Sequence, residues 1–266
     1  MLGGGGPLAV ALAALAGYGL AVLASVAAGS RVGSAGLIVG WVLHLAVLVL
    51  DIGGWGQSQP GARLGFAPVL SMTVWLVVAV YTVESRLVPL PAVRRWLALA
   101  GAVAVLLAVL FPGEPRSYAS PLAPLHFALG VGSYGLFGAA VLHAAMLDAA
   151  DRRLRLRTGA PGGAFGMPLL QLERLTFRFV EAGFAVLTAT LVLGLVTATG
   201  WRQDLHKTVF SVLAWCVFAA LLVGRRRQGW RGQRATRWLY AGALLLLLAY
   251  AGSRFVFEVL LGRTPV

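Results

Sequence analysis

Long apolar runs separated by short polar segments make up almost all of this chain. Each run is roughly 17–25 residues long, enough to cross the hydrocarbon core of a bilayer as an α-helix. Glycine, proline or charged residues punctuate the connections. The pattern therefore predicts an all-α, polytopic integral membrane bundle of about eight transmembrane helices. The predicted helices are Pro7–Ala28, Gly33–Leu50, Phe66–Glu84, Ala92–Phe111, Leu125–Leu147, Phe179–Thr199, Lys207–Val223 and Trp238–Leu261.

Composition supports the same class. Of the 266 residues, 59% are hydrophobic and 12% are charged, and the mean hydropathy is +0.84. Too few polar residues remain to cover a soluble globule of this size. No connection is longer than a loop, so we expect one transmembrane domain over residues 1–266. The first residues carry no positive charge, so the first run is interpreted as a retained helix and not as a signal peptide.

The distribution of positive charge orients the predicted bundle. The net charge is +13, but the arginines lie in short connections, where membrane topology explains them and nucleic-acid binding is not needed. They follow the first, third, fifth and seventh helices, so these connections are predicted to be cytoplasmic. Both termini and the loops Asp51–Gly65, Pro112–Pro124 and Gly200–His206 are then external. The basic residues concerned are Arg31, Arg86, Arg94, Arg95, Arg152, Arg153, Arg155, Arg157, Arg174, Arg225, Arg226, Arg227, Arg231, Arg234 and Arg237.

The histidines are the main candidates for chemistry. His126 and His206 open the fifth and seventh helices at the external interface, and His44 lies roughly 10 Å below it at 1.5 Å per residue. A histidine inside a membrane indicates function by default. Ordinary interfacial residues are the alternative for His126 and His206, and a helix–helix hydrogen bond is the alternative for His44. His143, near the cytoplasmic end, is interpreted as a packing residue.

The surroundings of His126 narrow the type of site. Gly130, Ser133 and Tyr134 follow it on one helix face, which lets a flat ligand or another helix come close. Two neutral imidazoles across such a gap are typical of a bis-His haem site. Zinc would require further ligands, and Asp204 alone adds little.

Other side chains could contribute to this site. Arg254 and Lys207 are candidates to meet haem propionates, although Arg254 could instead pair with Glu258. Met72 is a possible axial sulfur but is more typical of packing. The only cysteine, Cys216, lies within a predicted helix and offers no disulfide or CxxC pair.

From about Leu122 onward the chain resembles a known family. The residues that carry the likeness are LHFALGVGSYGLFGAAVLHAAMLD (125–148), MPLLQLERLTFRFVEAGFAVLTATLVLGL (167–195), DLHKTVFSVLAWCVFAALL (204–222) and GWRGQRATRWLYAGALLLLLAYAGSRF (229–255). They resemble the cytochrome c assembly superfamily of CcsA-, CcmC- and HemX-like membrane proteins, and within it the inner-membrane YpjD subgroup. The likeness is strongest over residues 122–260 and looser over the first four helices.

The resemblance implies a membrane protein that handles b-type, non-covalent haem on the outer side of a bacterial cytoplasmic (inner) membrane. His126 and His206 would be the axial ligands, with Trp201, Asp204 and Lys207 as a remnant of the family's Trp-rich external segment. The implied partners are haem, cytochrome c biogenesis membrane proteins or apocytochrome c, and membrane lipid. Val223-Gly224-Arg225 stands where the family often carries a histidine before an arginine, so haem contact is expected and haem-ligase activity is not.

Two other interpretations of the function stay open at this point. A small-solute or metal-ion transporter would need polar groups reaching the cytoplasmic half and helices broken near the middle of the membrane. A ligand-free membrane scaffold would need no site at all. No nucleophile–base arrangement is visible in the sequence, so we do not predict a conventional enzyme.

Overall fold

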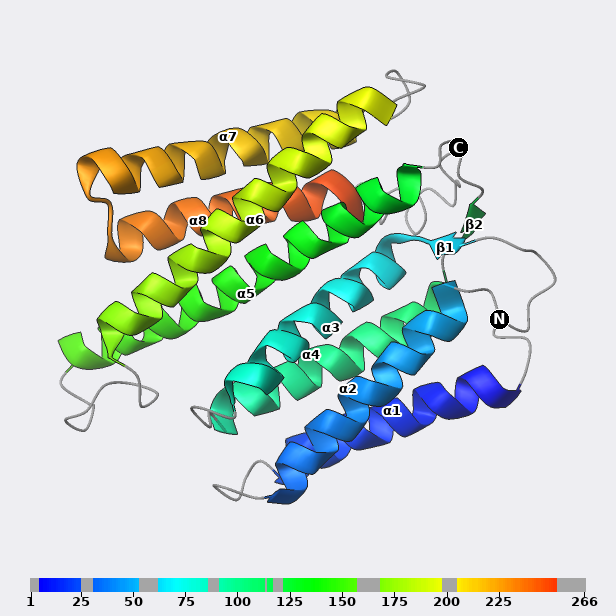
Figure 1. Ribbon diagram of the computed structural model, residues 1–266. Helices are drawn as coiled ribbons and strands as arrows, with labels where there is room; N and C mark the ends of the chain where they lie inside the picture. Colours follow the sequence, from blue (N-terminus) through cyan, green and yellow to red (C-terminus); the bar gives the residue numbers. More distant parts are fainter. Residues whose placement is uncertain are drawn as a thin grey trace. The chain divides into compact units, whose positions relative to one another are not determined.

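The computed structural model describes residues 5–24, 31–52, 62–85, 91–112, 114–116, 122–156, 168–197 and 205–252. Within these ranges the chain forms eight α-helices, two short strands and one π-helix (Figure 1). Seven of the helices are long and apolar enough to cross a membrane, which confirms the predicted polytopic all-α class. The chain divides into two compact units, Met1–Tyr118 and Ala119–Val266. The elements are α1 (Gly5–Ala24), α2 (Arg31–Ile52), β1 (Ala62–Leu64), α3 (Phe66–Glu84), α4 (Pro91–Leu110), β2 (Glu114–Arg116), α5 (Ala123–Arg155), α6 (Leu169–Thr197), α7 (Leu205–Gln228), α8 (Gly232–Leu247) and the π-helix η2 (Leu248–Gly252).

Tyr18 of α1 is the centre of the first unit. Its ring is fully buried and fills a slot between Gly40 of α2 and Gly101 of α4. A Cβ atom built on Gly101 would come within 2.5 Å of the Tyr18 ring, and one on Gly40 within 2.9 Å. Small residues let helix backbones approach closely in membranes. The two glycines therefore determine how α2 and α4 pack around α1.

A short β-sheet lies at one end of the first unit, and an arginine–serine hydrogen bond joins two helices at the other end. At one end β1 and β2 form a two-stranded antiparallel sheet, with Arg63 opposite Pro115, which the hydropathy pattern did not predict. The strands place the Asp51–Gly65 and Pro112–Pro124 loops at the same end, as expected. At the other end Arg94 of α4 donates to the Ser34 hydroxyl of α2 at 2.9 Å. The beginnings of α2 and α4 thus share one end, in agreement with the predicted alternation.

The second unit is a four-helix arrangement with an aromatic pair in its core. Phe137 of α5 and Phe218 of α7 stack at 3.8 Å between ring centroids. Gly183 of α6 covers the Phe137 ring, and Gly242 of α8 covers the Phe218 ring. In Figure 1, α5 runs beside α6 and α7 beside α8, and these pairs make extensive contacts. The stacked rings therefore mark the level at which α5 and α7 meet across the core.

All four helices of the second unit begin earlier or end later than predicted, and α7 ends at Gln228 instead of Val223. α5 continues to Arg155 instead of ending at Leu147, α6 begins at Leu169 instead of Phe179, and α8 begins at Gly232 instead of Trp238. These extensions are charged, so an apolar-run criterion excludes them. They are helical because they also bury residues such as Leu172 and Ala235 on one side. At 33 residues, α5 is about 50 Å long and exceeds the roughly 30 Å hydrocarbon core.

Buried carboxylates join the helices at this charged end. Glu173 of α6 accepts a hydrogen bond from Arg225 at 2.8 Å and lies 3.7 Å from Arg231. The Arg225 guanidinium also covers the Phe177 ring at 3.7 Å. The carboxylate links α6 to the end of α7 and to the residue that precedes α8. Charge-assisted bonds of this kind are stronger than neutral ones.

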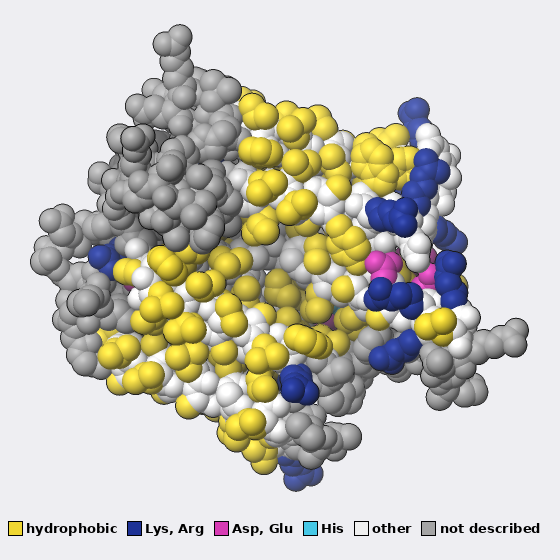
Figure 2. Space-filling model, turned by 180° about the vertical axis from the view of Figure 1, so that it is seen from behind, with side chains coloured by type: hydrophobic (Ala, Val, Ile, Leu, Met, Phe, Trp, Pro, Cys, Tyr) yellow, Lys and Arg dark blue, Asp and Glu magenta, His cyan; other side chains and the backbone are white. Residues whose placement is uncertain are grey.

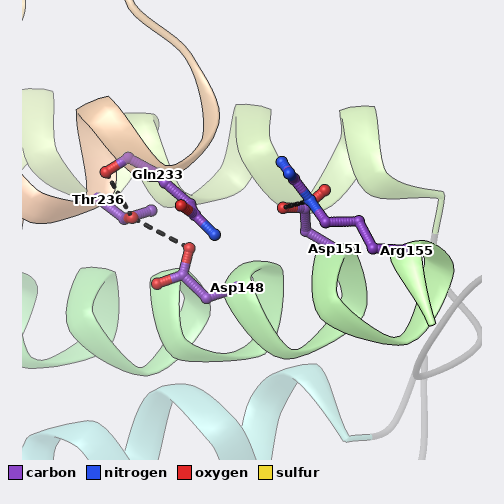
Figure 3. Close-up of polar contacts among 5 residues, drawn as sticks. All are labelled: Asp148, Asp151, Arg155, Gln233 and Thr236. Atoms are coloured by element: carbon purple, nitrogen blue, oxygen red, sulfur yellow. Dashed lines mark hydrogen bonds and ion pairs between the residues drawn. The ribbon is translucent and has the colours of Figure 1, made fainter.

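Asp148 makes the equivalent connection between α5 and α8. The Thr236 hydroxyl donates to one of its carboxylate oxygens at 3.0 Å and lies 3.3 Å from the Gln233 carbonyl (Figure 3). The Tyr240 hydroxyl donates to the other oxygen at 2.8 Å. Asp151, one turn further along α5, pairs with Arg155 within the same helix. Carboxylates thus fasten all four helices of this unit at one end.

Candidate functional site

His126 lies at the opposite end of the second unit, four residues into α5. Its imidazole is directed at α6, where it covers Gly194. A Cβ atom at Gly194 would come within 2.9 Å of the His126 Cε1 atom. The Nδ1 atom is buried and has no hydrogen-bond partner in the described part of the chain. An unpaired ring nitrogen in an apolar setting costs free energy, so this histidine carries a binding capacity that the fold does not use.

The face of α5 below His126 is lined by small residues, as the sequence predicted. Gly130 faces Thr190 of α6, with 3.8 Å between the position of a Cβ atom and the Thr190 methyl. The Ser133 hydroxyl donates to the Gly130 carbonyl of its own helix. The Tyr134 hydroxyl donates to the Leu246 carbonyl of α8, two residues before the π-helix. Both hydroxyls are therefore occupied by backbone, and His126 keeps the unpaired polar atom of this face.

The depths of His126 and His206 can be compared through the stacked phenylalanines. His126 lies 11 residues before Phe137, and His206 lies 12 residues before Phe218. At 1.5 Å per residue these separations are about 16.5 and 18 Å. Both residues belong to helical backbone that starts at the same end of the unit. The two backbone positions therefore lie at similar separations from the stacked rings along their own helices. The pairing of the two histidines stays a prediction, because the His206 side chain lies outside the described atoms.

Rotation around the helix axes distinguishes the two positions. Eleven residues are close to three full turns, so His126 falls within about 20° of Phe137 on α5. On α7 the residue eleven positions before Phe218 is Lys207, which therefore lies on the same side of its helix as Phe218. The Cα of His206 is rotated by about a further 100° around the α7 axis. Lys207 is half-buried and is the single charged side chain described at this end of the unit. The core-facing positions at this end are thus His126 and Lys207.

His44 belongs to the first unit and has both ring nitrogens engaged. Its Nδ1 lies 3.0 Å from the Tyr18 hydroxyl and its Nε2 lies 2.7 Å from the Ser71 hydroxyl. The residue is fully buried. To ligate a metal, His44 would have to give up one of these two partners. Its assignment to the site stays a prediction, and its observed contacts join α1, α2 and α3.

The remaining predicted residues divide into two groups. His143 is buried, its Nδ1 lies 2.7 Å from the Ala139 carbonyl, and its ring packs on Phe179, which fits its interpretation as a packing residue. Trp201, Asp204 and Arg254 lie outside the described residues. Their proposed roles therefore remain predictions.

A haem group fits the chemistry of the residues around His126. The imidazole offers an unpaired Nδ1 atom, and its ring packs on Gly194 of α6, with Gly130 one turn further along α5. Lys207 supplies a positive charge at the same end, where carboxylate groups of a ligand would need one. Three or more histidine, cysteine or acidic side chains do not gather into a metal site anywhere in the described ranges.

Gly194 is the residue that sequence reasoning missed. It lies in the apolar run LVLGLV, where a glycine has no local signature that distinguishes it from ordinary helix packing. The spacing Thr190–Gly194 places two small residues one turn apart on α6, which could have drawn attention to this face. Only the packing of α5 on α6 shows that the His126 ring occupies the space above it.

Comparison with known proteins gives a consistent group of relatives. The family model described as cytochrome C assembly protein matches residues 30–261. The inner membrane protein YpjD of Escherichia coli (strain K12) is 30% identical over 232 residues, which cover 84% of this chain and 85% of that protein. The cytochrome c biogenesis protein CcsA of Synechococcus sp. (strain CC9605) is 25% identical over 279 residues, 89% of this chain and 90% of that protein. No solved structure is significantly similar.

Proposed function

The chain belongs to the cytochrome c assembly protein family, and from this membership and the surroundings of His126 we propose that it binds haem non-covalently as a haem-handling protein. The observation that carries the proposal is the His126 imidazole, whose buried Nδ1 has no partner in the described structure and whose ring covers a glycine. Haem supplies an iron that accepts imidazole nitrogens as axial ligands. Such a ligand would satisfy the one polar atom that the fold leaves unpaired on this face.

The other residues take supporting roles in this proposal. His206 would be the second ligand on the ground of its depth, which nearly matches that of His126, although its Cα lies about 100° round α7 from the core-facing Lys207. Lys207 and Arg254 would meet the propionates through charge-assisted bonds. Trp201 and Asp204 would border the haem edge from the segment that precedes α7. The partners proposed for this function are haem, other membrane proteins of cytochrome c biogenesis and apocytochrome c.

The expected test is spectroscopic. Detergent-purified protein reconstituted with haem should show a low-spin bis-His absorption spectrum, and a pyridine haemochrome assay should report about one haem per chain. His126→Ala should abolish this spectrum because it removes the ligand. His143→Ala is the matched control, since it replaces a histidine of the same helix that already bonds to backbone.

Separate variants distinguish the parts of the proposal. Loss of the spectrum in His126→Ala but not in His206→Ala would keep the haem site and remove His206 from it. A parent protein that binds no haem under these conditions would contradict the proposed function and favour the ligand-free scaffold.

We also propose a location and an orientation. By analogy with its relative YpjD, an inner membrane protein, the chain is assigned to a bacterial inner membrane. The arginine-rich end of the second unit faces the cytoplasm and the His126 end faces outward, according to the bias of positive charge. Both termini are then external.

Reporter fusions check this orientation directly. A periplasm-active reporter should give signal when fused after Val266 and none when inserted at Gly159, because the arginines around the second position hold it on the cytoplasmic side. A cytoplasm-active reporter at the same two positions is the control and should give the reverse pattern. Equal signals at both positions would overturn the orientation and move the haem site to the other face.

A further inference from the structure

The arginine-rich end of the second unit displays positive charge and buries or pairs its negative charge. Glu173 is buried and Asp148 and Asp151 are partly buried, each with a partner described above, while the exposed Glu181 pairs with Arg226 at 3.4 Å. Figure 2 shows basic side chains gathered along one edge, next to a wide hydrophobic face. The exposed arginines at this end of the unit are Arg152, Arg153, Arg155, Arg174, Arg178, Arg226, Arg227, Arg231, Arg234 and Arg237. The surface there is strongly cationic because the carboxylates are engaged in ion pairs and hydrogen bonds within the protein.

The turn between α7 and α8 places part of this charge in a defined position. Gly229 and Gly232 have φ angles of 66° and 56°, a conformation that favours glycine. They allow the Trp230 indole to fold onto α7, where a Cβ atom at Gly224 would come within 2.5 Å of it. Trp230 packs against Trp238 at 5.3 Å, and the Arg234 guanidinium lies 4.2 Å above the Trp230 ring. The two packed indole rings therefore hold the Arg234 guanidinium on the face of Trp230.

Three arginines follow one another at every third position of this segment. Arg231, Arg234 and Arg237 are all exposed, whereas Ala235, Thr236 and Leu239 are buried in the same turns. Residues three apart on a helix are neighbours, so the three guanidinium groups form one row, which we call the α8 arginine row. Arg231 shares Glu173 with Arg225, so one carboxylate faces two guanidinium groups and positive charge remains in excess.

The surroundings of the row indicate a membrane surface. Leu154, Leu156 and Leu170 are exposed at the same end of the unit, at 52%, 71% and 69%. Exposed leucines at the same end of the helices as arginines and tryptophans are typical of the level where hydrocarbon gives way to headgroups. An acidic protein or a nucleic acid would match the charge but not the exposed leucines. The molecule that presents anionic phosphate next to acyl chains is an anionic phospholipid.

We propose that the α8 arginine row, with Trp230 and Trp238 beside it, binds the phosphate groups of anionic phospholipids. Guanidinium groups meet phosphate oxygens through paired, charge-assisted hydrogen bonds. Basic residues next to membrane helices attract anionic lipid in this manner. The surface lies at the end of the unit opposite to His126, and the inference does not depend on haem binding.

Native mass spectrometry of the full-length protein in detergent tests this interaction. Titration with phosphatidylglycerol should give tighter lipid adducts than titration with phosphatidylcholine. The variant R234Q/R237Q should weaken the phosphatidylglycerol affinity by about five-fold for each arginine removed. The matched control R31Q/R95Q removes two exposed arginines from the first unit and should keep the parent affinity. Thermal unfolding without added lipid verifies that both variants are folded.

The outcomes separate this proposal from its competitors. A selective loss in R234Q/R237Q supports the α8 arginine row. An equal loss in both variants would show a general effect of net charge and would overturn it, as would an unchanged affinity in R234Q/R237Q. If inorganic phosphate at the same concentration displaces phosphatidylglycerol, the site recognises free phosphate and the assignment to lipid is wrong.

Discussion

The Gly101→Ala protein is expected to unfold far more easily than the parent. A Cβ atom at this position would come within 2.5 Å of the Tyr18 Cζ atom and within 2.9 Å of two further ring atoms. The ring has little room to move away, because Gly40 also packs closely on it and its hydroxyl is hydrogen-bonded to His44. Overpacking and a weakened hydrogen bond together should lower the free energy of unfolding by roughly 2–4 kcal/mol.

An SDS titration in mixed micelles, followed by circular dichroism, measures this free energy. Gly19→Ala is the matched control, because it makes the same substitution in α1, one residue beyond Tyr18. Apart from the adjoining residues and backbone of α1, no described atom lies within 4 Å of the Cβ position there, and alanine favours helix over glycine by about 1 kcal/mol. The control should be as stable as the parent or more stable. Similar stability of the two variants would contradict the close packing of Tyr18 on Gly101.

The Gly194→Ala protein is expected to fold normally but to lose most of its haem affinity. The added methyl group would meet the His126 Cε1 atom at 2.9 Å and the Nδ1 atom at 3.5 Å. Because His126 is half-buried and sits at a helix end, its ring can swing aside, so the cost in stability should stay below about 1 kcal/mol. The imidazole would then leave the position from which we propose that it would hold haem. We expect at least a roughly ten-fold weaker haem affinity, which corresponds to about 1.4 kcal/mol.

Absorbance titration with haem measures this affinity, and a melting curve in detergent measures stability. Gly132→Ala provides the control from the facing helix, since its Cβ position is 4.0 Å from Val186, an ordinary contact. It should leave both measurements unchanged. If His126→Ala abolishes haem binding while Gly194→Ala binds haem like the parent, Gly194 does not position the His126 imidazole for haem. The haem would then contact a part of the imidazole ring that faces away from Gly194.

Much of the fold follows from the sequence. Apolar runs of membrane length predict helices because a backbone in lipid must satisfy its own hydrogen bonds. Proline, glycine and charge locate the connections. The alternation of arginines predicted which helix ends lie together, and Arg94 with Ser34 in one unit and Glu173 with Arg225 and Arg231 in the other agree with it. The family likeness over the second half was also visible in the sequence.

The sequence predicted the lengths of the helices less accurately. The segment that begins α6 carries Glu173, Arg174 and Arg178, so its hydropathy does not indicate a membrane span. It is helical because Leu172, Thr176 and Phe177 are buried against neighbouring helices, and the helix continues straight out of the apolar run. A criterion based on apolar content alone ends such helices too early.

The sequence by itself determined which segments are helices and which ends of them carry charge, since both depend on local composition. Only the tertiary structure decided how each helix is rotated about its axis. A helix that is apolar nearly all round has no polar face to indicate its orientation. The sequence therefore could not show that Tyr18 fits between Gly40 and Gly101, that His44 has two partners, or that the His126 ring covers Gly194. These contacts depend on pairs of residues that are far apart in the chain and meet only when the helices pack.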